Sequence, residues 1–192
     1  MGFDASEINA IFGKSLFVMI DFERVQEMIG CGKVVLVDGE AKEELVLDQN
    51  FPMHCRIELS SEDGEYTFVW SIKQSDKNTI RLSLHCMDED SKLGLIRVDY
   101  NAGHINPETA DENLPECFRP YIAKHFKDNE HHVHMYVPGY RQMAWALPIA
   151  DTKLKQQEIN IESIDFDIIS AINSFADVIN LKTKLLVNPI LL

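Results

Sequence analysis

Apolar and polar residues alternate with a period of two through the middle of the chain. In Met53–Leu59 every second residue is apolar, and Tyr66–Ile72 follows the same pattern after a turn at Asp63-Gly64. Thr79–Cys86 and Gly94–Tyr100 predict two more strands. Because side chains alternate between the two faces of a strand, the pattern predicts a meander of half-buried strands.

Shorter alternating segments predict further strands on both sides of this meander. Val34–Val37 and Leu45–Leu47 flank an acidic turn with Asp38-Gly39, a sequence typical of a hairpin turn. Later in the chain, His132–Val137 and Ala144–Ile149 carry apolar residues at alternate positions. We therefore expect a small extra hairpin before the meander and two strands after it.

Apolar residues recur at helical spacing near both ends of the chain. Asp4 and Glu7 have capping-box spacing before an apolar stripe, and a second helical segment is expected over Phe22–Ile29. Ser163 or Asp165 can cap a C-terminal helix. The apolar stripe of that helix consists of Ile168, Ile169, Ile172, Phe175, Ala176 and Ile179.

Residues 102–131 lack a clear period. Pro107, Pro115 and Pro120 exclude a long helix there, because proline breaks the helical hydrogen-bond ladder. A short helix near Tyr121–Lys127 fits the remaining pattern, and the rest of the segment is expected to be an irregular loop.

These elements predict one α+β domain, with a mainly antiparallel sheet of about five to seven strands. An N-terminal helical segment precedes the sheet, and the C-terminal helix is expected to pack on it. A doubly wound parallel sheet is the competing architecture, but the connections between Met53 and Asn101 are too short for helical crossovers. The expected parts of the single domain 1–192 are a helical part (1–32), a β-rich core (33–150) and a C-terminal helix with an apolar tail (151–192).

Composition and charge exclude some function classes. The chain has 192 residues, of which 45% are hydrophobic and 26% are charged, as in ordinary folded proteins. Its net charge of −13 disfavours generic binding to DNA or RNA, since an acidic surface repels phosphates. Residues 1–50 hold ten acids against four bases, so this part could engage a basic protein partner.

The sequence predicts a cytoplasmic protein without a membrane anchor. Its first residues are acidic, and no apolar run reaches the roughly 18 residues of a membrane helix. The four cysteines are at least 24 residues apart, which excludes a CxxC metal motif and suits reduced thiols. The apolar tail Val187–Leu192 could dock on the core or join two copies of the chain in a homodimer.

Three histidines are the most informative residues. His132 and His134 share one face of a predicted strand with Tyr136, because they lie two residues apart. His104 follows the strand Gly94–Tyr100 in a turn. If that strand neighbours the histidine strand, the three imidazoles converge on one pocket.

This histidine group admits three kinds of role. His104, His132 and His134 are candidate catalytic residues, because imidazoles transfer protons near neutral pH. They could instead bind a divalent metal, for which Asp99 is the best-placed extra ligand, or they could fasten the loop 102–131 to the sheet. We expect no resident cofactor, since Walker, GxGxxG, GxSxG, HExxH and EF-hand motifs are absent from the sequence.

Polar and aromatic residues near the histidines are candidate ligand-binding residues. Residues 131–150 contain no Asp or Glu. Arg141 could therefore hold a phosphate or carboxylate there, or simply be a solvated turn residue. Trp145 could anchor the core or stack on a ligand. The full set of candidates is Asn101, Asn106, Tyr136, Tyr140, Arg141 and Trp145.

Four short motifs follow one another between residues 95 and 148. They are an Asp-x-Asn-x-x-His-x-Asn-Pro run ending at Pro107, His-x-His-x-Tyr at His132–Tyr136, Gly139-Tyr140, and Trp-Ala-Leu-Pro at Trp145–Pro148. Over residues 53–192 the chain resembles an uncharacterised family of small bacterial proteins that are often encoded in prophages or other mobile elements. It departs from that family in the long insertion Glu108–Glu130 and in residues 34–47.

The resemblance implies no activity, so two functional hypotheses stay open. The first is a histidine-lined pocket that binds or processes a small anionic or phosphorylated ligand. The second is an acidic interaction or inhibitor protein of a phage or mobile element that acts on a basic protein partner. Metal content and gene neighbours would separate them.

Overall fold

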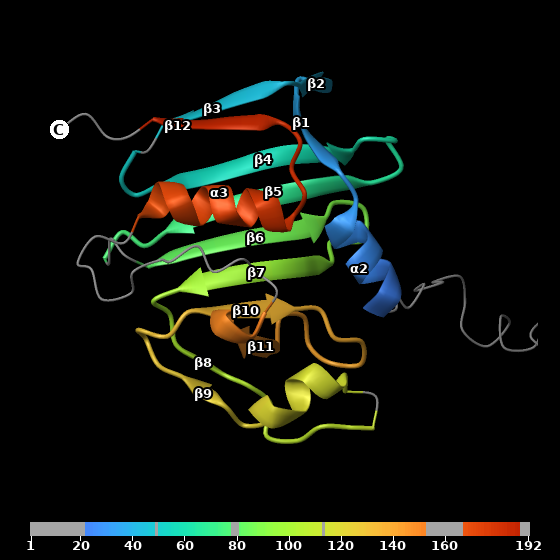
Figure 1. Ribbon diagram of the computed structural model, residues 1–192, viewed down its shortest axis with the longest axis vertical. Helices are drawn as coiled ribbons and strands as arrows, with labels where there is room; N and C mark the ends of the chain where they lie inside the picture. Colours follow the sequence, from blue (N-terminus) through green and yellow to red (C-terminus); the bar gives the residue numbers. More distant parts are fainter. Residues whose placement is uncertain (1–21, 49, 78–80, 113, 153–166, 189–192) are drawn as a thin grey trace, which may run out of the picture.

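The central feature of the computed structural model is a large antiparallel sheet (Figure 1). The structure describes residues 22–48, 50–77, 81–112, 114–152 and 167–188. The eight strands lie in the order β11-β10-β7-β6-β5-β4-β1-β2. Their bounds are β1 Lys33–Val37, β2 Glu40–Lys42, β4 His54–Ser61, β5 Thr67–Gln74, β6 Leu82–Asp88, β7 Gly94–Tyr100, β10 His132–Met135 and β11 Trp145–Pro148. The predicted antiparallel α+β fold is confirmed, with one strand more than the expected upper number.

Two smaller strand pairs and two short 3₁₀ helices complete the β-rich part. β3 (Glu44–Asp48) pairs in parallel with β12 (Lys184–Asn188), and β8 (His104–Ile105) pairs antiparallel with β9 (His125–Phe126). The 3₁₀ helices are η1 (Glu116–Tyr121) and η2 (Ile149–Asp151). β12 contains the first two residues of the predicted apolar tail, while residues 189–192 lie outside the described part.

The predicted hairpin near Asp38-Gly39 is partly wrong. β1 turns at Asp38-Gly39 and pairs with β2, so that Val37 lies opposite Glu40. Both turn residues have positive φ, which suits a tight two-residue hairpin turn and forces pairing to begin at Glu40. Leu45–Leu47 instead belongs to β3 and pairs with β12.

The short helix predicted near Tyr121–Lys127 is also wrong. The chain forms η1 before this segment and β9 within it. Ala123 has a positive φ of 56°, which ends helical geometry, and Phe126 then pairs with His104 of β8. The loop is therefore tied to the histidine region by a strand pair.

Two helices, α2 (Phe22–Gly30) and α3 (Ile168–Val178), lie in front of the sheet (Figure 1). Asp167 caps α3, since its Oδ1 accepts from the Ile169 N–H at 3.0 Å. Phe175 of α3 stacks on Trp70 of β5, with ring centroids 5.8 Å apart. The predicted docking of the C-terminal helix is thus confirmed, while Ser163, Asp165 and residues 1–21 lie outside the described part.

A buried lysine joins both helices to the sheet. The Lys33 ammonium donates to the carbonyls of Ile29 at 2.9 Å, Cys31 at 3.0 Å and Ile179 at 2.9 Å. It also lies 4.7 Å from the Phe68 ring centroid. This group, the Lys33 clamp, satisfies three carbonyls where α2 and α3 end, because the last carbonyls of a helix lack partners within the helix.

The alternation of the strands gives the sheet two different faces. Ile72, Leu84, Val98 and Val133 form one apolar cross-strand row in the main core. The neighbouring positions form two polar rows instead. These rows are Lys73–Ser83–Asp99–His132 and Ser71–His85–Arg97–His134. The polar rows place the candidate chemistry on the face opposite the apolar row. No helix in the described part is long and apolar enough to cross a membrane.

Candidate functional site

Asp99, His132 and His134 meet where the two polar rows cross β7 and β10, and we call them the Asp99 cluster. Asp99 lies directly opposite His132 in the antiparallel register. Its Oδ2 is 3.2 Å from Nε2 of His134 and 3.8 Å from Nε2 of His132. One ligand atom from each residue lies within 4.8 Å of the others, and all three residues are buried.

The hydrogen bonds of His134 conflict in every protonation state. Its Nδ1 is 2.8 Å from the Met143 carbonyl and therefore needs a proton to donate. Its Nε2 is 2.8 Å from Nη2 of Arg97, a donor that requires a lone pair on Nε2. The same Nε2 is 3.2 Å from Oδ2 of Asp99, an acceptor that requires a proton on Nε2. A cation that takes the Nε2 lone pair and the carboxylate oxygen together would remove the conflict between these two atoms, and it would displace Arg97 from Nε2.

His132 points an unpartnered nitrogen at the same carboxylate. Its Nδ1 lies 3.3 Å from the Glu130 carbonyl, so Nδ1 is the protonated nitrogen and Nε2 keeps its lone pair. Within the described part of the chain, Nε2 of His132 and Oδ1 of Asp99 are buried without a hydrogen-bond partner. Such orphaned atoms are costly and call for a physical reason, of which an ion is one.

His104 covers the cluster without directing its donor nitrogen into it. Its ring centroid lies 4.4 Å from that of His134 and 5.7 Å from that of His132. Its Nε2 contacts the Asn106 Oδ1 at 3.1 Å and the Ala144 carbonyl at 3.0 Å, so this nitrogen is the donor. The structure thus brings the three predicted histidines together, with His104 packed over the other two.

The electrostatics of the Asp99 cluster favour the forms that bind metal. Burial alone would raise the pKa of Asp99. Contact with His134 and with the Arg97 guanidinium nevertheless holds this pKa well below its ordinary value. Burial lowers the pKa of His132 to about 4, and burial also lowers the pKa of His134 and of His104. Near neutral pH the cluster therefore presents a carboxylate and neutral imidazoles, which are the ligating forms.

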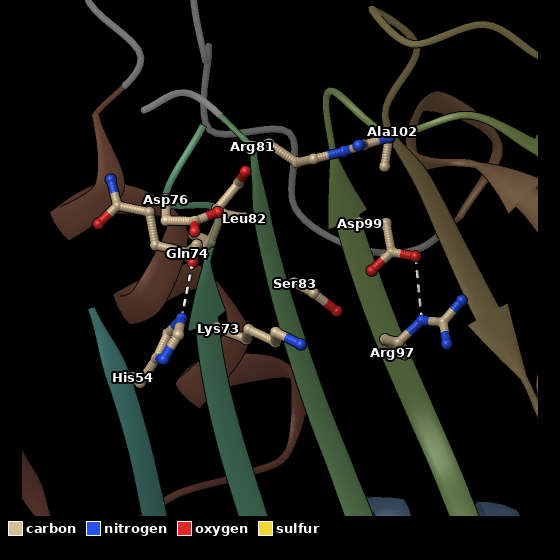
Figure 2. A pocket seen from close by; sticks show the side chains of 11 residues that line it. His54, Lys73, Gln74, Asp76, Arg81, Leu82, Ser83, Arg97, Asp99 and Ala102 are labelled. Carbon is tan, nitrogen blue, oxygen red and sulfur yellow. Dashed lines mark hydrogen bonds and ion pairs between the residues drawn. The ribbon is translucent and has the colours of Figure 1, made fainter. Parts of the chain in front are cut away.

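A cavity of about 590 Å³, lined mainly by residues with polar or charged side chains, adjoins the cluster across β4–β7. Asp99 and Arg97 belong to its wall, and Arg97 Nε donates to Asp99 Oδ2 at 3.0 Å. Figure 2 shows Lys73 and Ser83 on the strands between His54 and Asp99. The cationic residues of the wall are Lys73, Arg81 and Arg97, and its acidic residues are Asp76 and Asp99.

Two of the predicted ligand-binding residues form hydrogen bonds near the histidines, Asn106 through its side chain and Asn101 through its backbone. Buried Asn106 accepts from the Ala146 N–H at 2.9 Å and donates to the carbonyls of Ala146 and Tyr121 at 2.8 and 2.9 Å. The Asn101 N–H donates to Nδ1 of His131 at 3.1 Å. The Asn106 side chain is therefore engaged with backbone groups and with His104 rather than with the ligand atoms of the Asp99 cluster.

The other predicted ligand-binding residues lie elsewhere. Tyr136 follows the end of β10 and packs half-buried against the main core. Trp145 is fully buried in a second apolar cluster, where the Tyr140 ring meets it edge-on at 5.3 Å. Arg141 is exposed and is not among the described residues that line the cavity. Of the two roles considered for Trp145, the structure supports the core anchor.

Sequence reasoning missed the cavity wall and the role of Arg97. Lys73 and Ser83 are polar residues in strands that are otherwise largely apolar, and this pattern in the sequence could have indicated a polar site. Their alignment with Asp99 and His132 depends on the strand register, which spacing along the chain does not reveal. Arg97 pairs with Asp99 and also contacts His134, and the strand register that brings it to His134 is not visible in the sequence.

Comparison with protein families shows to which family this chain belongs. A family model described as a family of unknown function (DUF6978) matches residues 23–181, which is most of the chain. The chain belongs to this family. The membership confirms that the chain belongs to a family of unknown function, and it carries no activity with it. No curated protein and no solved structure matches the chain.

Proposed function

We propose that this member of the family binds a divalent transition-metal ion through the Asp99 cluster and presents it to a small anionic ligand in the cavity. One observation carries the proposal. Three buried atoms that can ligate a metal converge, and each imidazole ties its other nitrogen to a backbone carbonyl. This second hydrogen bond is characteristic of histidines that ligate metals, because it fixes the tautomer and the ring orientation.

The donor set suits a transition metal better than calcium or magnesium. Two imidazoles and one carboxylate match zinc and iron sites, whereas calcium and magnesium prefer oxygen ligands throughout. Ligand atoms on a tetrahedral ion with bonds of about 2.0 Å lie about 3.3 Å apart. The separations of 3.2 and 3.8 Å from Asp99 Oδ2 bracket this value, while the two imidazole nitrogens lie within 4.8 Å of each other and would approach one another on a shared ion.

The lining of the cavity indicates the charge of the further ligand that the metal could bind. Three protein ligands leave a coordination position for water or another ligand. Because Asp99 belongs to both the cluster and the cavity wall, a molecule in the cavity can reach the ion. Lys73, Arg81 and Arg97 make this wall rich in cations, although the chain as a whole carries −13. A small anion therefore suits the cavity.

Metal titration of the full chain tests the proposal. We expect one Co²⁺ or Zn²⁺ per chain, measured by calorimetry, with Co²⁺ giving the visible absorption of a low-symmetry site. His134→Gln should weaken binding at least about 10-fold, since even outer partners of metal ligands contribute that much. His125→Gln is the matched control, because His125 is exposed on β9 and outside the cluster.

Two results would contradict the proposal. The first is the absence of saturable binding by the wild-type chain. The second is equal affinity in the wild type and in His134→Gln, which would place any bound metal elsewhere. In the latter case the Asp99 cluster would be a structural group that fastens β8 and β9 to the sheet.

A second proposal concerns protein partners. β2 and the residues beside it expose four acids, Asp38, Glu40, Glu43 and Glu44, of which Glu40 and Glu44 pair with Lys42 and Lys184. This edge supports binding of a basic partner encoded by a phage or other mobile element. The neighbouring genes test it, because a toxin, nuclease or repressor gene would favour it. A metabolic operon would favour the metal and anion proposal instead.

A further inference from the structure

We infer that metal binding at the Asp99 cluster frees Arg97 to complete, with Lys73 and Ser83, a subsite for a phosphate-type oxyanion. The two ligands would then bind cooperatively. This inference rests on the proposed metal site and adds to it the class of the anion, the residues that hold it and the coupling between the two.

Arg97 uses the electron pairs that a metal would need. Its Nη2 lies 2.8 Å from Nε2 of His134, and its Nε donates to Oδ2 of Asp99 at 3.0 Å. These two acceptor atoms are also the closest pair of candidate ligand atoms, 3.2 Å apart. The single lone pair of His134 Nε2 cannot serve a guanidinium proton and a metal ion at once, so an incoming ion breaks this hydrogen bond. Asp99 Oδ2 has a second lone pair, and there the repulsion between the ion and the guanidinium weakens the bond from Arg97 Nε.

The displaced guanidinium has a place in the cavity. Arg97 lines the cavity wall, and 30% of its side chain is exposed, whereas the side chains of His132 and His134 are fully buried. The backbone of Arg97 is fixed by pairing of β7 with both β6 and β10. The side chain therefore turns toward the cavity when it leaves the cluster.

Two further donors line the cavity beside it, and one of them, the Ser83 hydroxyl, interacts with the Asp99 carboxylate in the metal-free protein. Lys73 lies opposite Ser83, and Ser83 lies opposite Asp99, so the three side chains stand on neighbouring strands (Figure 2). Neighbouring positions of this kind are about 5 Å apart. Within the described part, the Lys73 ammonium makes no hydrogen bond or ion pair.

An ammonium, a hydroxyl and a planar guanidinium together match a tetrahedral oxyanion. Arginine can bind two oxygens of a phosphate at once, whereas lysine contributes a compact positive charge. Without metal, the Asp99 carboxylate neutralises Arg97 and repels an anion at the same place. With metal, the carboxylate is bound to the ion, and the cavity wall gains positive charge.

The two sites are therefore coupled by charge and by Arg97. If metal strengthens the binding of an oxyanion, the oxyanion must strengthen the binding of metal by the same factor. We expect about a 10-fold effect, which is in the usual range for coupled sites. The effect should be measurable from both directions.

Calorimetry of the full chain with Co²⁺ and methyl phosphate tests this coupling. We expect wild-type protein to bind methyl phosphate about 10-fold more tightly when Co²⁺ is present. Arg97→Gln should bind Co²⁺ more tightly than the wild type, because a competitor for the ligand atoms is gone, and should lose the coupling. Arg56→Gln is the control with the same charge change, since Arg56 pairs with Glu89 outside the cavity.

Each outcome has a defined meaning. If the wild type binds Co²⁺ but its affinity for methyl phosphate is unchanged, the inference is wrong and the metal site stands. Weaker Co²⁺ binding by Arg97→Gln also overturns it, because Arg97 would then support the ligands. If Arg97→Gln does not fold, Lys73→Gln decides: it should keep Co²⁺ affinity and lose methyl phosphate affinity, and unchanged affinity for both overturns the inference. No Co²⁺ binding by the wild type removes the proposed function and this inference together.

Discussion

Two buried polar groups on the large sheet differ in how completely their hydrogen bonds are satisfied. In the Lys33 clamp, three carbonyls surround the ammonium at 2.9–3.0 Å. In the Asp99 cluster, His134 faces conflicting neighbours, and Nε2 of His132 and Oδ1 of Asp99 are buried without partners in the described part. Both groups are fully or almost fully buried, so solvent does not explain the difference.

The difference separates a structural group from a candidate functional one. A satisfied buried charge holds elements in place, and its removal leaves several groups unpaired. A buried cluster with orphaned atoms costs stability in every state that lacks its ligand. We therefore expect the Lys33 clamp to matter for folding and the Asp99 cluster to matter mainly for binding.

Removal of the Lys33 ammonium should give the largest loss of stability. Lys33→Met keeps the apolar stem but leaves the carbonyls of Ile29, Cys31 and Ile179 without their donor. Because each buried unsatisfied carbonyl costs about 1–3 kcal/mol, we expect the free energy of unfolding to fall by about 3 kcal/mol or more. Urea denaturation measures this change.

A matched lysine provides the control for that prediction. Lys42 lies on β2, and its ion pair with Glu40 is exposed on both sides. Since exposed ion pairs contribute little, Lys42→Met should lower the free energy of unfolding by less than about 1 kcal/mol. Equal losses in the two variants would show that the Lys33 clamp does not join the helices to the sheet.

The sequence predicted the meander and the C-terminal helix well because their signals are local. Alternation in Met53–Leu59 and the apolar stripe of α3 each depend on residues near one another in the chain. The sequence did not predict that β3 pairs with β12, nor that β9 forms and pairs with β8. Periodicity describes one segment at a time and does not indicate which distant segment pairs with it. Both errors therefore arose from pairing between segments that are distant in the sequence.

The candidate site was predictable in its residues but not in its geometry. The spacing of His132 and His134 indicated one face, and Asp99 was named as an extra ligand. The burial of these residues, the conflict at His134 and the position of Arg97 depend on strand register. Register is set by turns and by the whole sheet, which explains why the Lys73–Ser83–Asp99–His132 row was not foreseen.

Acid should destabilise the metal-free protein through the histidines. Burial lowers the pKa of His132 and of His85 to about 4, and burial lowers the pKa of His134 as well. The unfolded chain therefore binds protons first, and stability present at pH 7 is lost as the pH falls from about 6.5 toward 4. A pKa that falls from about 6.5 to about 4 corresponds to about 3 kcal/mol for one histidine, so we expect a loss of several kcal/mol, measured by urea denaturation at each pH.

Variants assign this loss to the buried histidines. His132→Phe should flatten the decline in stability between pH 6.5 and 4, because the unfolded chain then takes up one proton fewer relative to the folded chain. His125→Gln removes an exposed histidine and should leave the decline unchanged. A decline that is equally steep in His132→Phe would attribute it to other groups.

The smallest effect on stability should follow from replacing His132 itself at neutral pH. His132→Phe removes an orphaned buried nitrogen and loses one long hydrogen bond to the Glu130 carbonyl, at 3.3 Å. The new ring stays beside Phe126, whose centroid lies 4.7 Å from that of His132. Because replacing an unsatisfied polar group by an apolar one of similar shape is nearly neutral, we expect the metal-free stability to change by less than about 1 kcal/mol.

Added Co²⁺ should stabilise the wild type and leave His132→Phe unchanged, since a ligand stabilises only the state that binds it. A loss of about 3 kcal/mol without metal would instead place His132 among the structural residues, like Lys33.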